Sequence, residues 1–387
     1  MKILLVGASG YARHYLNALL AGKVDCDEFF VVDPFIERSE SLDTLIARGI
    51  KIYAAMEDFY ANNSADLAIV STPISLHKEH IETAMKNGSH CLCEKPLCAT
   101  IDEALEIEQI VSKSGKMLGV GFQWSWSNIM QALKKDIIAG EFGSPIMLKT
   151  LIAWKRGDKY YDKSGWKGKV KDTRGNWLLD SVVTNATAHY LHNIFFLTGD
   201  DMLSANTPTS VSGSVYRGRD IESFDTCLLK GSLDGGGEFL FAATHMCEET
   251  HNPSFEYKFE KGTIYHDSNI SDEVYAKFNN GTTKNYSALA DPNEDFLKLY
   301  LMVNAVQNGG APLCTDKTCV PHIKVCNGIF KDFKVIEAPP ELRIKTEDGQ
   351  FVKGFLEKCK TAYTTEKLDT ITAEFDPRDI THFDAIC

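Results

Sequence analysis

The chain has 387 residues and a formal net charge of -12 at pH 7. This is more than one hydrophobic core usually holds, so we expect two domains. The acidic balance argues against a nucleic-acid surface or an anionic membrane as partner, because nothing offsets the repulsion over the whole chain. No apolar run approaches the roughly 20 residues that a membrane span needs.

The first apolar run, residues 2–6, stops at Gly7 without the long apolar stretch and cleavage site of a signal peptide. We therefore expect the mature chain to begin in a strand, in the cytoplasm. The 11 cysteines are an odd number in a long chain without a secretion signal, so we expect reduced thiols that pack as small apolar side chains. Their spacing does not match a zinc site, and we predict no metal centre.

A glycine-containing loop follows the first strand and leads into a helix that extends to about Gly22. The loop is a variant of the dinucleotide-binding fingerprint, in which Ser9 stands at the second glycine and Ala12 at the third. Glycine lets backbone N–H groups approach a pyrophosphate, and the helix N-terminus favours its charge. The predicted cofactor contacts in this loop are Gly7, Ser9, Gly10, Tyr11 and Ala12.

The next strand, residues 29–32, ends in Asp33. An acidic residue about 20 positions beyond the glycine loop accepts hydrogen bonds from the adenosine ribose and repels a 2'-phosphate, so NAD is favoured over NADP. Two alternatives stay open. Arg38 could bind that phosphate, and Asp33 could serve only as a cap of the turn before Pro34.

Strands and helices alternate through the first third of the chain. We predict further strands at 51–54, 66–71, 89–93 and 117–121, and helices at 39–48, 56–60, 76–86 and 100–115. This alternation predicts a parallel, doubly wound Rossmann-type α/β sheet, which we assign to residues 1–123. Such sheets bind ligands at the carboxyl ends of their strands.

The strand at 89–93 ends in Glu94, Lys95 and Pro96, which places an acid, an ammonium and a stiff ring at its carboxyl end. A lysine held against apolar walls at such a place can lose hydration, lower its pKa and give or take a proton. The alternative is an idle surface lysine. Gln123 and Trp124 follow the sixth strand at the same edge.

These motifs resemble the signature of the glucose-fructose oxidoreductase, inositol dehydrogenase and rhizopine-catabolism family (Gfo/Idh/MocA). The likeness rests on Val70-Ser-Thr-Pro-x3-His77 and Gly88-Ser-His-Cys-Leu-Cys-Glu-Lys-Pro96, and it covers roughly residues 1–335. It implies that Lys95 lies by the nicotinamide and hydrogen-bonds the reacting hydroxyl. The further cofactor contacts that we predict are Ser71, Thr72, Pro73, His77, Glu94, Lys95 and Gln123.

The second half of the chain reads differently. Segments at 145–155, 210–217, 224–232, 237–245, 255–266 and 274–280 are strand-like and separated by Gly, Asp and Asn, and helices are predicted at 294–307 and 318–333. The resemblance implies an α+β domain, residues 124–335, with a large open, mainly antiparallel sheet. It also implies that this sheet joins copies of the chain into a dimer or tetramer, and that the last helices pack on the first domain. Residues 336–387 are a C-terminal extension, either an arm on a neighbouring subunit or a solvated appendage.

Aromatic and cationic side chains are dense after residue 154. Aromatic faces suit the C–H faces of a sugar or cyclitol, and Lys and Arg donate to hydroxyls or to a carboxylate. For each residue the alternative is a loop folded over its own aromatics. We predict substrate contacts from Lys95, Trp124, Lys155, Arg156, Tyr160, Tyr161, Trp166, Asp180, Asn185, His189 and His192.

Residues 180–199 are predicted as one helix that carries a polar stripe of Ser181, Asn185, His189 and His192. Such a stripe on an apolar helix must meet water, partners or substrate. Against the family motif Asp-x-Gly-x-His-x-x-Asp, His189 matches the histidine, while Asn185 and His192 replace the two carboxylates. His189 is still a candidate general base near neutral pH, with Asp180 or Lys95 as substitute for the lost acid.

The resemblance implies reversible oxidation of a secondary hydroxyl of a sugar, sugar derivative or cyclitol to a ketone, with hydride passing to NAD. Lys95 and His189 are the candidate catalytic residues. Two alternatives stay open: an NAD-retaining glycosidase or lyase that uses transient oxidation, and a non-catalytic NAD-binding regulator. Net NADH formation distinguishes the first alternative, and turnover of any sugar excludes the second.

Overall fold

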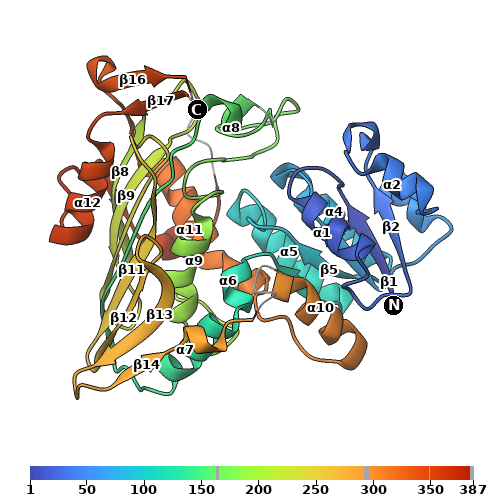
Figure 1. Ribbon diagram of the computed structural model, residues 1–387, viewed down its shortest axis with the longest axis horizontal. Coiled ribbons are helices and arrows are strands. Elements are labelled where there is room, and N and C mark those ends of the chain that lie inside the picture. Colours follow the sequence, from blue (N-terminus) through green and yellow to red (C-terminus); the bar gives the residue numbers. More distant parts are fainter. Residues whose placement is uncertain (163–164, 292–295, 348, 384–387) are drawn as a thin grey trace. The chain divides into compact units, whose positions relative to one another are not determined.

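A computed structural model describes residues 1–162, 165–291, 296–347 and 349–383 (Figure 1). Contacts within the chain divide it into two units. Unit 1 comprises Met1–Cys98, Asp102–Trp126 and Asn293–Cys319, and unit 2 comprises Ala99–Ile101, Ser127–Pro292 and Val320–Cys387. The last third of the chain thus contributes to both units, and the C-terminal extension belongs to unit 2.

Unit 1 is built on a six-stranded parallel sheet with the strand order β3-β2-β1-β4-β5-β6. Its strands are β1 (Lys2–Val6), β2 (Glu28–Val32), β3 (Ile52–Tyr53), β4 (Leu67–Val70), β5 (His90–Cys93) and β6 (Leu118–Val120). Every residue of β4 is buried, because helices cover both faces of a parallel sheet. The predicted Rossmann-type, doubly wound sheet is confirmed.

The helices of this part of the chain follow the predicted rhythm. They are α1 (Ala12–Leu20), α2 (Leu42–Ala47), α3 (Met56–Tyr60), α4 (His77–Lys86), α5 (Ile101–Ser114), α6 (Gln123–Trp126) and α10 (Leu297–Asn308), with 3-10 turns at Ile36–Arg38 and Ile74–Leu76. Alternate strand residues pack on each face: Leu4, Val6, Phe30 and Val32 share one core cluster with Phe59 of α3. Helix α10 comes from far along the sequence and contributes the buried side chain of Lys298 to unit 1.

Unit 2 contains a 10-stranded sheet with the path β14-β13-β12-β11-β7-β10-β9-β8-β15, and β18 also pairs with β8. Its strands are β7 (Pro145–Ala153), β8 (Ser210–Arg217), β9 (Thr226–Ser232), β10 (Glu238–Thr244), β11 (His251–Phe259), β12 (Gly262–Asp267), β13 (Ser271–Phe278), β14 (Thr283–Asn285), β15 (Val335–Glu337) and β18 (Ala373–Phe375). Its neighbours are antiparallel except β7 with β10 and β8 with β15. The predicted large, mainly antiparallel sheet is confirmed.

One predicted strand in this sheet is wrong. Residues 255–266 form not one strand but the hairpin of β11 and β12, because the exposed polar pair Glu260 and Lys261 makes a turn between the two apolar stretches.

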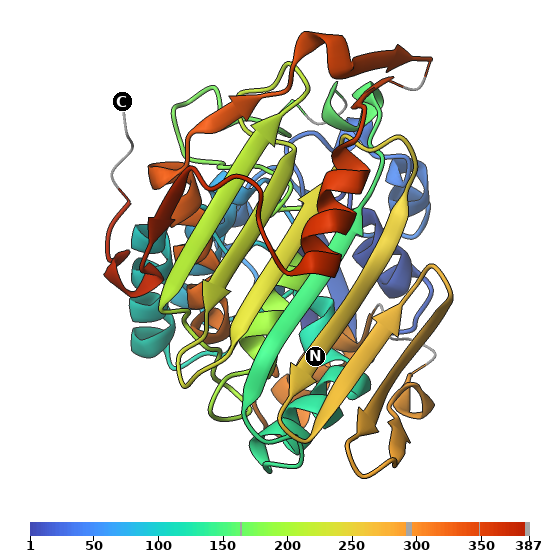
Figure 2. The ribbon, with the colours of Figure 1, turned by 90° about the vertical axis from the view of Figure 1, so that its left-hand side faces the viewer.

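Unit 2 has helices on both faces of its large sheet. The helices of this part of the chain are α7 (Asn128–Ile138), α8 (Asp158–Asp162), which contacts the hairpin strand β17 (Gly349–Val352) instead, α9 (Ala188–Leu197), α11 (Asp316–Asp332) and α12 (Phe355–Thr365), with a 3-10 turn at Ser287–Leu289. Helices α7 and α9 pack together on one face, and α12 lies across the other (Figures 1 and 2). Helix α9 is buried on nearly all sides, as its sequence of Leu, Ile and Phe predicts.

The predicted helix at 180–199 is wrong in its first half, since α9 begins only at Ala188 and residues 181–187 form turns. Leu179 has a φ of 47°, which breaks the helical geometry. The hydroxyl of Thr184 donates to Leu179 O at 2.8 Å, and that of Thr187 donates to Val182 O at 2.6 Å. Short hydroxyl side chains that bind nearby carbonyls compete with helical hydrogen bonds, so the predicted polar stripe does not lie on one helix.

The C-terminal extension packs on the sheet of its own chain, which contradicts the predicted solvated appendage. It contains β16 (Arg343–Thr346), β17 (Gly349–Val352), α12, β18, and 3-10 turns at Pro340–Leu342 and Pro377–Asp379. Helix α12 buries Phe355, Leu356, Cys359 and Ala362. Together with Met147, Leu240 and Met246 of the sheet side, these apolar residues form continuous core rather than a solvated surface.

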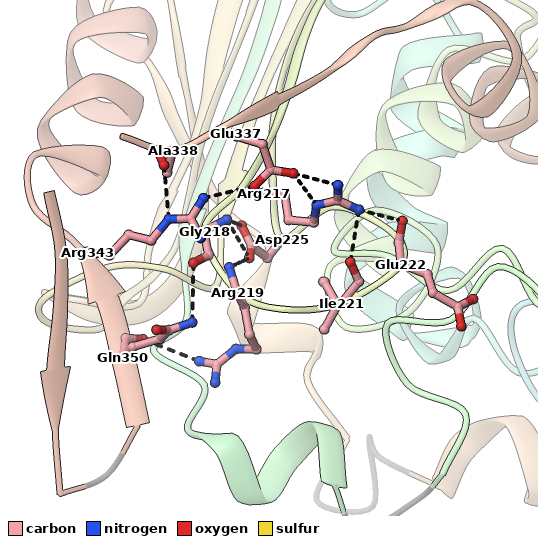
Figure 3. Close-up of polar contacts among 10 residues, drawn as sticks. All are labelled: Arg217, Gly218, Arg219, Ile221, Glu222, Asp225, Glu337, Ala338, Arg343 and Gln350. Atoms are coloured by element: carbon pink, nitrogen blue, oxygen red, sulfur yellow. Dashed lines mark hydrogen bonds and ion pairs between the residues drawn. The ribbon is translucent and has the colours of Figure 1, made fainter. Parts of the chain in front are cut away.

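Polar contacts fasten the same extension at the end of β8 (Figure 3). Glu337 accepts from Arg217 Nε at 2.7 Å and from Arg343 Nη2 at 2.8 Å. Gln350 Nε2 donates to Gly218 O at 3.2 Å, and Arg219 Nη2 donates to Gln350 O at 3.3 Å.

No helix within the described ranges has the length and hydropathy to span a bilayer.

Candidate active site

The strands of unit 1 end in register, which gathers the predicted cofactor residues at one edge of the sheet. Val6 aligns with Val32 and Val70, Val70 with Cys93, and Cys93 with Val120. The segments that follow these residues are the glycine loop, Asp33, Ser71–Pro73, Glu94–Pro96 and Gln123. This is the edge at which open α/β sheets bind ligands.

Gly7 turns the chain at this edge where no other residue fits. Its φ is +94°, and an added Cβ would lie 2.6 Å from Ser71 O. Gly10 also has a positive φ, and an added Cβ there would meet nothing within 4 Å, so the loop surface above it is open. Ser9 and Tyr11 are exposed beside it, and Ala12 is buried as the first residue of α1. The loop therefore fits the close approach of a phosphate group.

Asp33 ties the glycine loop to the end of β2. Its Oδ2 accepts from Ala8 N at 2.8 Å, and its Oδ1 accepts from Phe35 N at 2.9 Å. The second contact is the turn cap that the sequence left open as an alternative. Each carboxylate oxygen keeps a lone pair for a further donor, so the cap does not exclude a ribose hydroxyl. Arg38 lies over the Phe35 ring at 4.5 Å.

His77 is buried behind the two turns rather than displayed at the edge. It is 1% exposed. Its Nε2 lies 2.9 Å from Thr72 O, while its Nδ1 lies 3.0 Å from Pro96 O and 3.2 Å from Leu97 O. This corrects the direct cofactor contact that we predicted for His77, because both ring nitrogens face backbone carbonyls. The ring braces the Thr72-Pro73 turn against the turn that contains Lys95.

Glu94 is likewise engaged within the protein. It is 7% exposed, and its Oε1 accepts from Lys298 Nζ at 2.5 Å and from Tyr15 OH at 2.6 Å. Burial alone would raise the pKa of Glu94, but Lys298, Tyr15 and Lys95 together outweigh it and the pKa is lowered. The predicted cofactor contact of Glu94 is therefore corrected to an internal ion pair at the base of the site.

Lys95 is half-buried between Glu94, which Lys298 holds, and Pro96, whose carbonyl faces His77. Its backbone N–H donates to Glu94 Oε2 at 3.2 Å. The thiols of Cys91 and Cys93 in the preceding strand are buried, and burial raises the pKa of both. They pack as apolar groups, which leaves Lys95 as the candidate acid–base side chain of this segment.

Tyr11, Gln123 and Trp124 complete the edge. Tyr11 OH donates to Gln123 Oε1 at 3.3 Å, which links the glycine loop to the start of α6. Trp124 is half-buried in the same helix. Ser71, Thr72 and Pro73 lie beside the glycine loop, with the Thr72 side chain 3.0 Å from His80 Nδ1.

In unit 2, several predicted substrate residues form one aromatic and cationic cluster. The Arg156 guanidinium lies over Trp154 at 5.3 Å and over Tyr160 at 4.9 Å, and Lys167 Nζ lies 3.7 Å from the Tyr160 ring centre. Tyr161 OH is 2.8 Å from His245 Nδ1. The sequence-predicted residues of the cluster are thus Arg156, Tyr160 and Tyr161. Lys155 and Trp166 are half-buried nearby in sequence.

The acid–base residues that we predicted after this cluster take different positions. Asp180 is buried and accepts from Gly168 N at 2.5 Å and from Asn185 Nδ2 at 2.9 Å. His189 lies in the first turn of α9 and is half-buried. His192 is wholly buried and stacks on Phe196, with ring centres 5.8 Å apart. The predicted substrate contact of His192 is corrected, because α9 packs this side into the core.

A cationic cavity of about 730 Å³ lies beside the cluster, since Tyr161 forms part of its wall. Its charged lining residues are Lys167, Lys169, Arg217, Arg219, Arg343, Asp220, Glu222 and Glu337. Glu337 is shared between two of these arginines (Figure 3). Arg219 is paired with Asp158, and Lys167 and Lys169 are the lining cations that could meet an anionic group.

Sequence reasoning missed four residues: Tyr15, Gly121, His245 and Lys298. Lys298 carried a signal, since a lysine between Leu297 and Leu299 in an apolar helix needs a partner. Gly121 leaves room for Glu94, whose carboxylate would lie 2.9 Å from an added Cβ. His245 lies at the end of β10, and nothing in its local sequence distinguishes it.

Residues 1–122 match the sequence profile of the Gfo/Idh/MocA family, described as "Oxidoreductase family, NAD-binding Rossmann fold". The chain is 26% identical over 216 residues to 1,5-anhydro-D-fructose reductase of Ensifer adhaerens, a match that covers 56% of this chain and 61% of that protein. It is 31% identical over 152 residues to scyllo-inositol 2-dehydrogenase (NAD(+)) of Bacillus subtilis, covering 38% of this chain and 42% of that protein. The chain therefore spans less than two thirds of the length of these curated relatives.

Solved structures share the fold over a longer range. The WlbA dehydrogenase from Chromobacterium violaceum, in complex with NADH and UDP-GlcNAcA, has a TM-score of 0.69 at 22% identity and covers 84% of this chain and 91% of its own. An oxidoreductase from Agrobacterium radiobacter, in complex with NAD+, L-tartaric acid and magnesium, has a TM-score of 0.68 at 13% identity and covers 98% of both chains. The second likeness extends over the C-terminal extension as well.

The glycine loop, the anchored Glu94-Lys95-Pro96 turn and the profile match agree on one assignment. Residues 1–122 of this chain match the NAD-binding Rossmann domain of the Gfo/Idh/MocA oxidoreductase family.

Proposed function

We propose that the protein is an NAD-dependent dehydrogenase that reversibly oxidises a secondary hydroxyl of a sugar, sugar derivative or cyclitol to a ketone. The observation that carries this proposal is the position of Lys95. Its half-buried amine follows β5 at the ligand-binding edge, and the residues on both sides of it are held by buried partners. A lysine whose backbone is held so firmly at this edge is suited to proton transfer.

Other residues of this edge are proposed to bind the cofactor. The backbone N–H groups of the glycine loop would hold the pyrophosphate, and the free lone pairs of Asp33 would accept the ribose hydroxyls. NAD, when bound, supplies a hydride acceptor. Lys95 would hold the substrate hydroxyl and take its proton as the carbon is oxidised, and would return the proton in the reverse direction.

His189 is proposed as a second acid–base group. Asn185 cannot ionise, and its amide binds Asp180, so the carboxylate–histidine pair of the family motif is not rebuilt from those two residues. Replacement of His189 by Asn in wild-type and Lys95→Met backgrounds tests this role. If both groups serve one proton transfer, the double variant is hardly slower than the slower single variant.

The names of the relatives support the substrate class, since anhydrofructose is a polyhydroxylated ketone and inositol is a cyclic polyol. Uronic acids and sugar phosphates belong in a substrate panel beside neutral hexoses and inositols, because of the cationic cavity in unit 2. Incubation of the protein with NAD and this panel, while NADH absorbance is followed, tests the proposal. NADH formation with at least one polyol supports it, and transformation of a glycoside without net NADH supports the transient-oxidation alternative.

Lys95→Met should lower turnover by about 10²-fold or more while NAD still binds, which is the scale of acid–base catalysis. Lys86→Met is a matched control, because Lys86 is an exposed lysine on α4 that pairs with Glu82. Turnover that Lys95→Met leaves unaltered contradicts the role assigned to Lys95.

Assembly into a dimer or tetramer through the unit 2 sheet stays a prediction, as does a cytoplasmic location. Helix α12 covers β7 and β10 on one face of the sheet. A second copy would have to use other strands of the sheet, for example β11 to β14, where Tyr265 and Tyr275 stack with ring centres 5.5 Å apart. Light scattering of the purified protein measures the assembly directly.

A further inference from the structure

Lys298 is a charged side chain in a buried position, where it needs partners that compensate its charge. It is 0% exposed, in the first turn of α10. Its ammonium contacts Glu94 Oε1 at 2.5 Å, Tyr11 OH at 3.2 Å and Gly121 O at 3.5 Å. These three partners stabilise the buried ammonium, because an unpaired ammonium would move to solvent or lose its proton.

These contacts join three segments of the ligand-binding edge. Tyr11 belongs to the glycine loop, Glu94 precedes Lys95, and Gly121 follows β6. Tyr15 of α1 adds a hydrogen bond to the same Glu94 oxygen at 2.6 Å. We propose that Lys298 is a positioning residue, which holds Glu94 and compensates its charge so that this carboxylate does not stabilise the Lys95 ammonium.

Glu94 interacts with both Lys298 and Lys95, so its charge acts on the amine that we propose to be catalytic. With Lys298 present, the carboxylate and the buried ammonium largely cancel at Lys95. Without Lys298, the carboxylate would act alone and would favour the protonated form of Lys95. A lysine that must accept a proton would then work only at higher pH.

Other titratable groups face this pair and must be considered. Burial alone would lower the pKa of Lys298, but Glu94 raises it, so both members of the pair are charged near neutral pH. The groups around them are Tyr11 of the glycine loop, Tyr15 of α1, His77 of α4, Cys93 of β5 and Lys95 itself. Burial raises the pKa of Tyr15 and Cys93 and lowers that of His77, so these three are neutral.

The test measures the protonation of Lys95 without any substrate. The whole protein is labelled with trace acetic anhydride across a range of pH, and mass spectrometry of the peptide that contains Lys95 gives the pH of half-maximal labelling. For Lys298→Met we expect this pH to rise by about one unit relative to wild type. The double variant Glu94→Gln/Lys298→Met removes both charges and should return it to the wild-type position.

The double variant separates charge from structure, since a merely loosened turn would behave alike in both variants. Lys134→Met is a matched control: it also removes a wholly buried lysine, which contacts Ser204 O and the Phe196 ring in unit 2. It should leave the half-labelling pH of Lys95 unchanged. If Lys298→Met does not fold, Glu94→Gln leaves Lys298 uncompensated and should lower that pH by about one unit.

An unchanged half-labelling pH in Lys298→Met, or the same shift in the double variant, overturns the proposal. The catalytic importance of Lys95 rests on the proposed function, but the labelling result does not. If a substrate is identified, the acidic limb of the kcat profile should move with the labelling curve. A labelling shift without any sugar turnover would leave Lys298 confirmed and the dehydrogenase proposal wrong.

Discussion

Replacing His77 with alanine should destabilise the protein by about 3 kcal/mol. The ring is 1% exposed, and burial lowers its pKa, so near pH 7 it is neutral and donates one hydrogen bond. Loss of that donor leaves a backbone carbonyl of Thr72, Pro96 or Leu97 unsatisfied, at about 1–3 kcal/mol, and the cavity left by the ring adds about 1–2 kcal/mol.

Urea unfolding followed by tryptophan fluorescence, with and without NAD, measures both effects of this substitution. We expect the free energy of unfolding to fall and the Kd for NAD to rise about tenfold, the equivalent of about 1.4 kcal/mol, because two turns of the site lose their brace. His77→Gln can restore one donor and should recover part of the stability. His80→Ala, which removes a half-buried ring beside Thr72, is the control and should cost less.

The reasoning fails if His77→Ala keeps wild-type stability and yet loses NAD binding. That result would mean that the imidazole touches the cofactor itself, as the sequence motif suggested, and that its contacts with the two turns contribute little.

Three further substitutions test other parts of the structure. Gly7→Ala should weaken NAD binding at least tenfold in titration calorimetry, because the added Cβ would overlap Ser71 O. The control is Gly22→Ala: Gly22 has a φ of +65° and open space around it, so this substitution should cost only about 1 kcal/mol of stability. Burial and neighbouring cations lower the pKa of His245 to about 3, so wild-type stability is complete above pH 6.5 and declines as the pH falls toward 3. At pH 4.5 the wild type should have lost about 2.7 kcal/mol more than His245→Gln in urea unfolding, and equal losses would contradict a neutral buried His245. Phe355→Ala should cost about 3–4 kcal/mol, because this buried ring packs against Tyr216 with centres 5.5 Å apart, and a near-neutral effect would show that α12 is not part of the core.

Local sequence patterns were enough to predict most elements of unit 1. Short apolar strands and amphipathic helices alternate there, and each pattern is readable within about ten residues. Gly7, Asp33 and Glu94-Lys95-Pro96 follow strands of one parallel sheet, so their meeting at one edge could be deduced from order alone.

Prediction failed where a segment had the spacing of a helix and also side chains that favour turns. Residues 180–187 have the spacing of an amphipathic helix, but Thr184 and Thr187 bind nearby carbonyls and Leu179 adopts a positive φ. Side-chain hydrogen bonds of this kind depend on exact backbone positions, which periodicity does not encode. The extension was also misjudged, because the polar surface of α12 is visible in its sequence and the sheet face that receives its apolar side is not.

The motifs at the strand ends were sufficient to predict a dinucleotide-binding edge with a lysine on it, because strand ends and turn residues are local signals. The surroundings of that lysine depend on contacts between distant segments and could be seen only in the folded chain. Glu94 and Lys298 are 204 residues apart, and no spacing rule pairs them. Burial in a shared core made each charge costly alone and brought the two together.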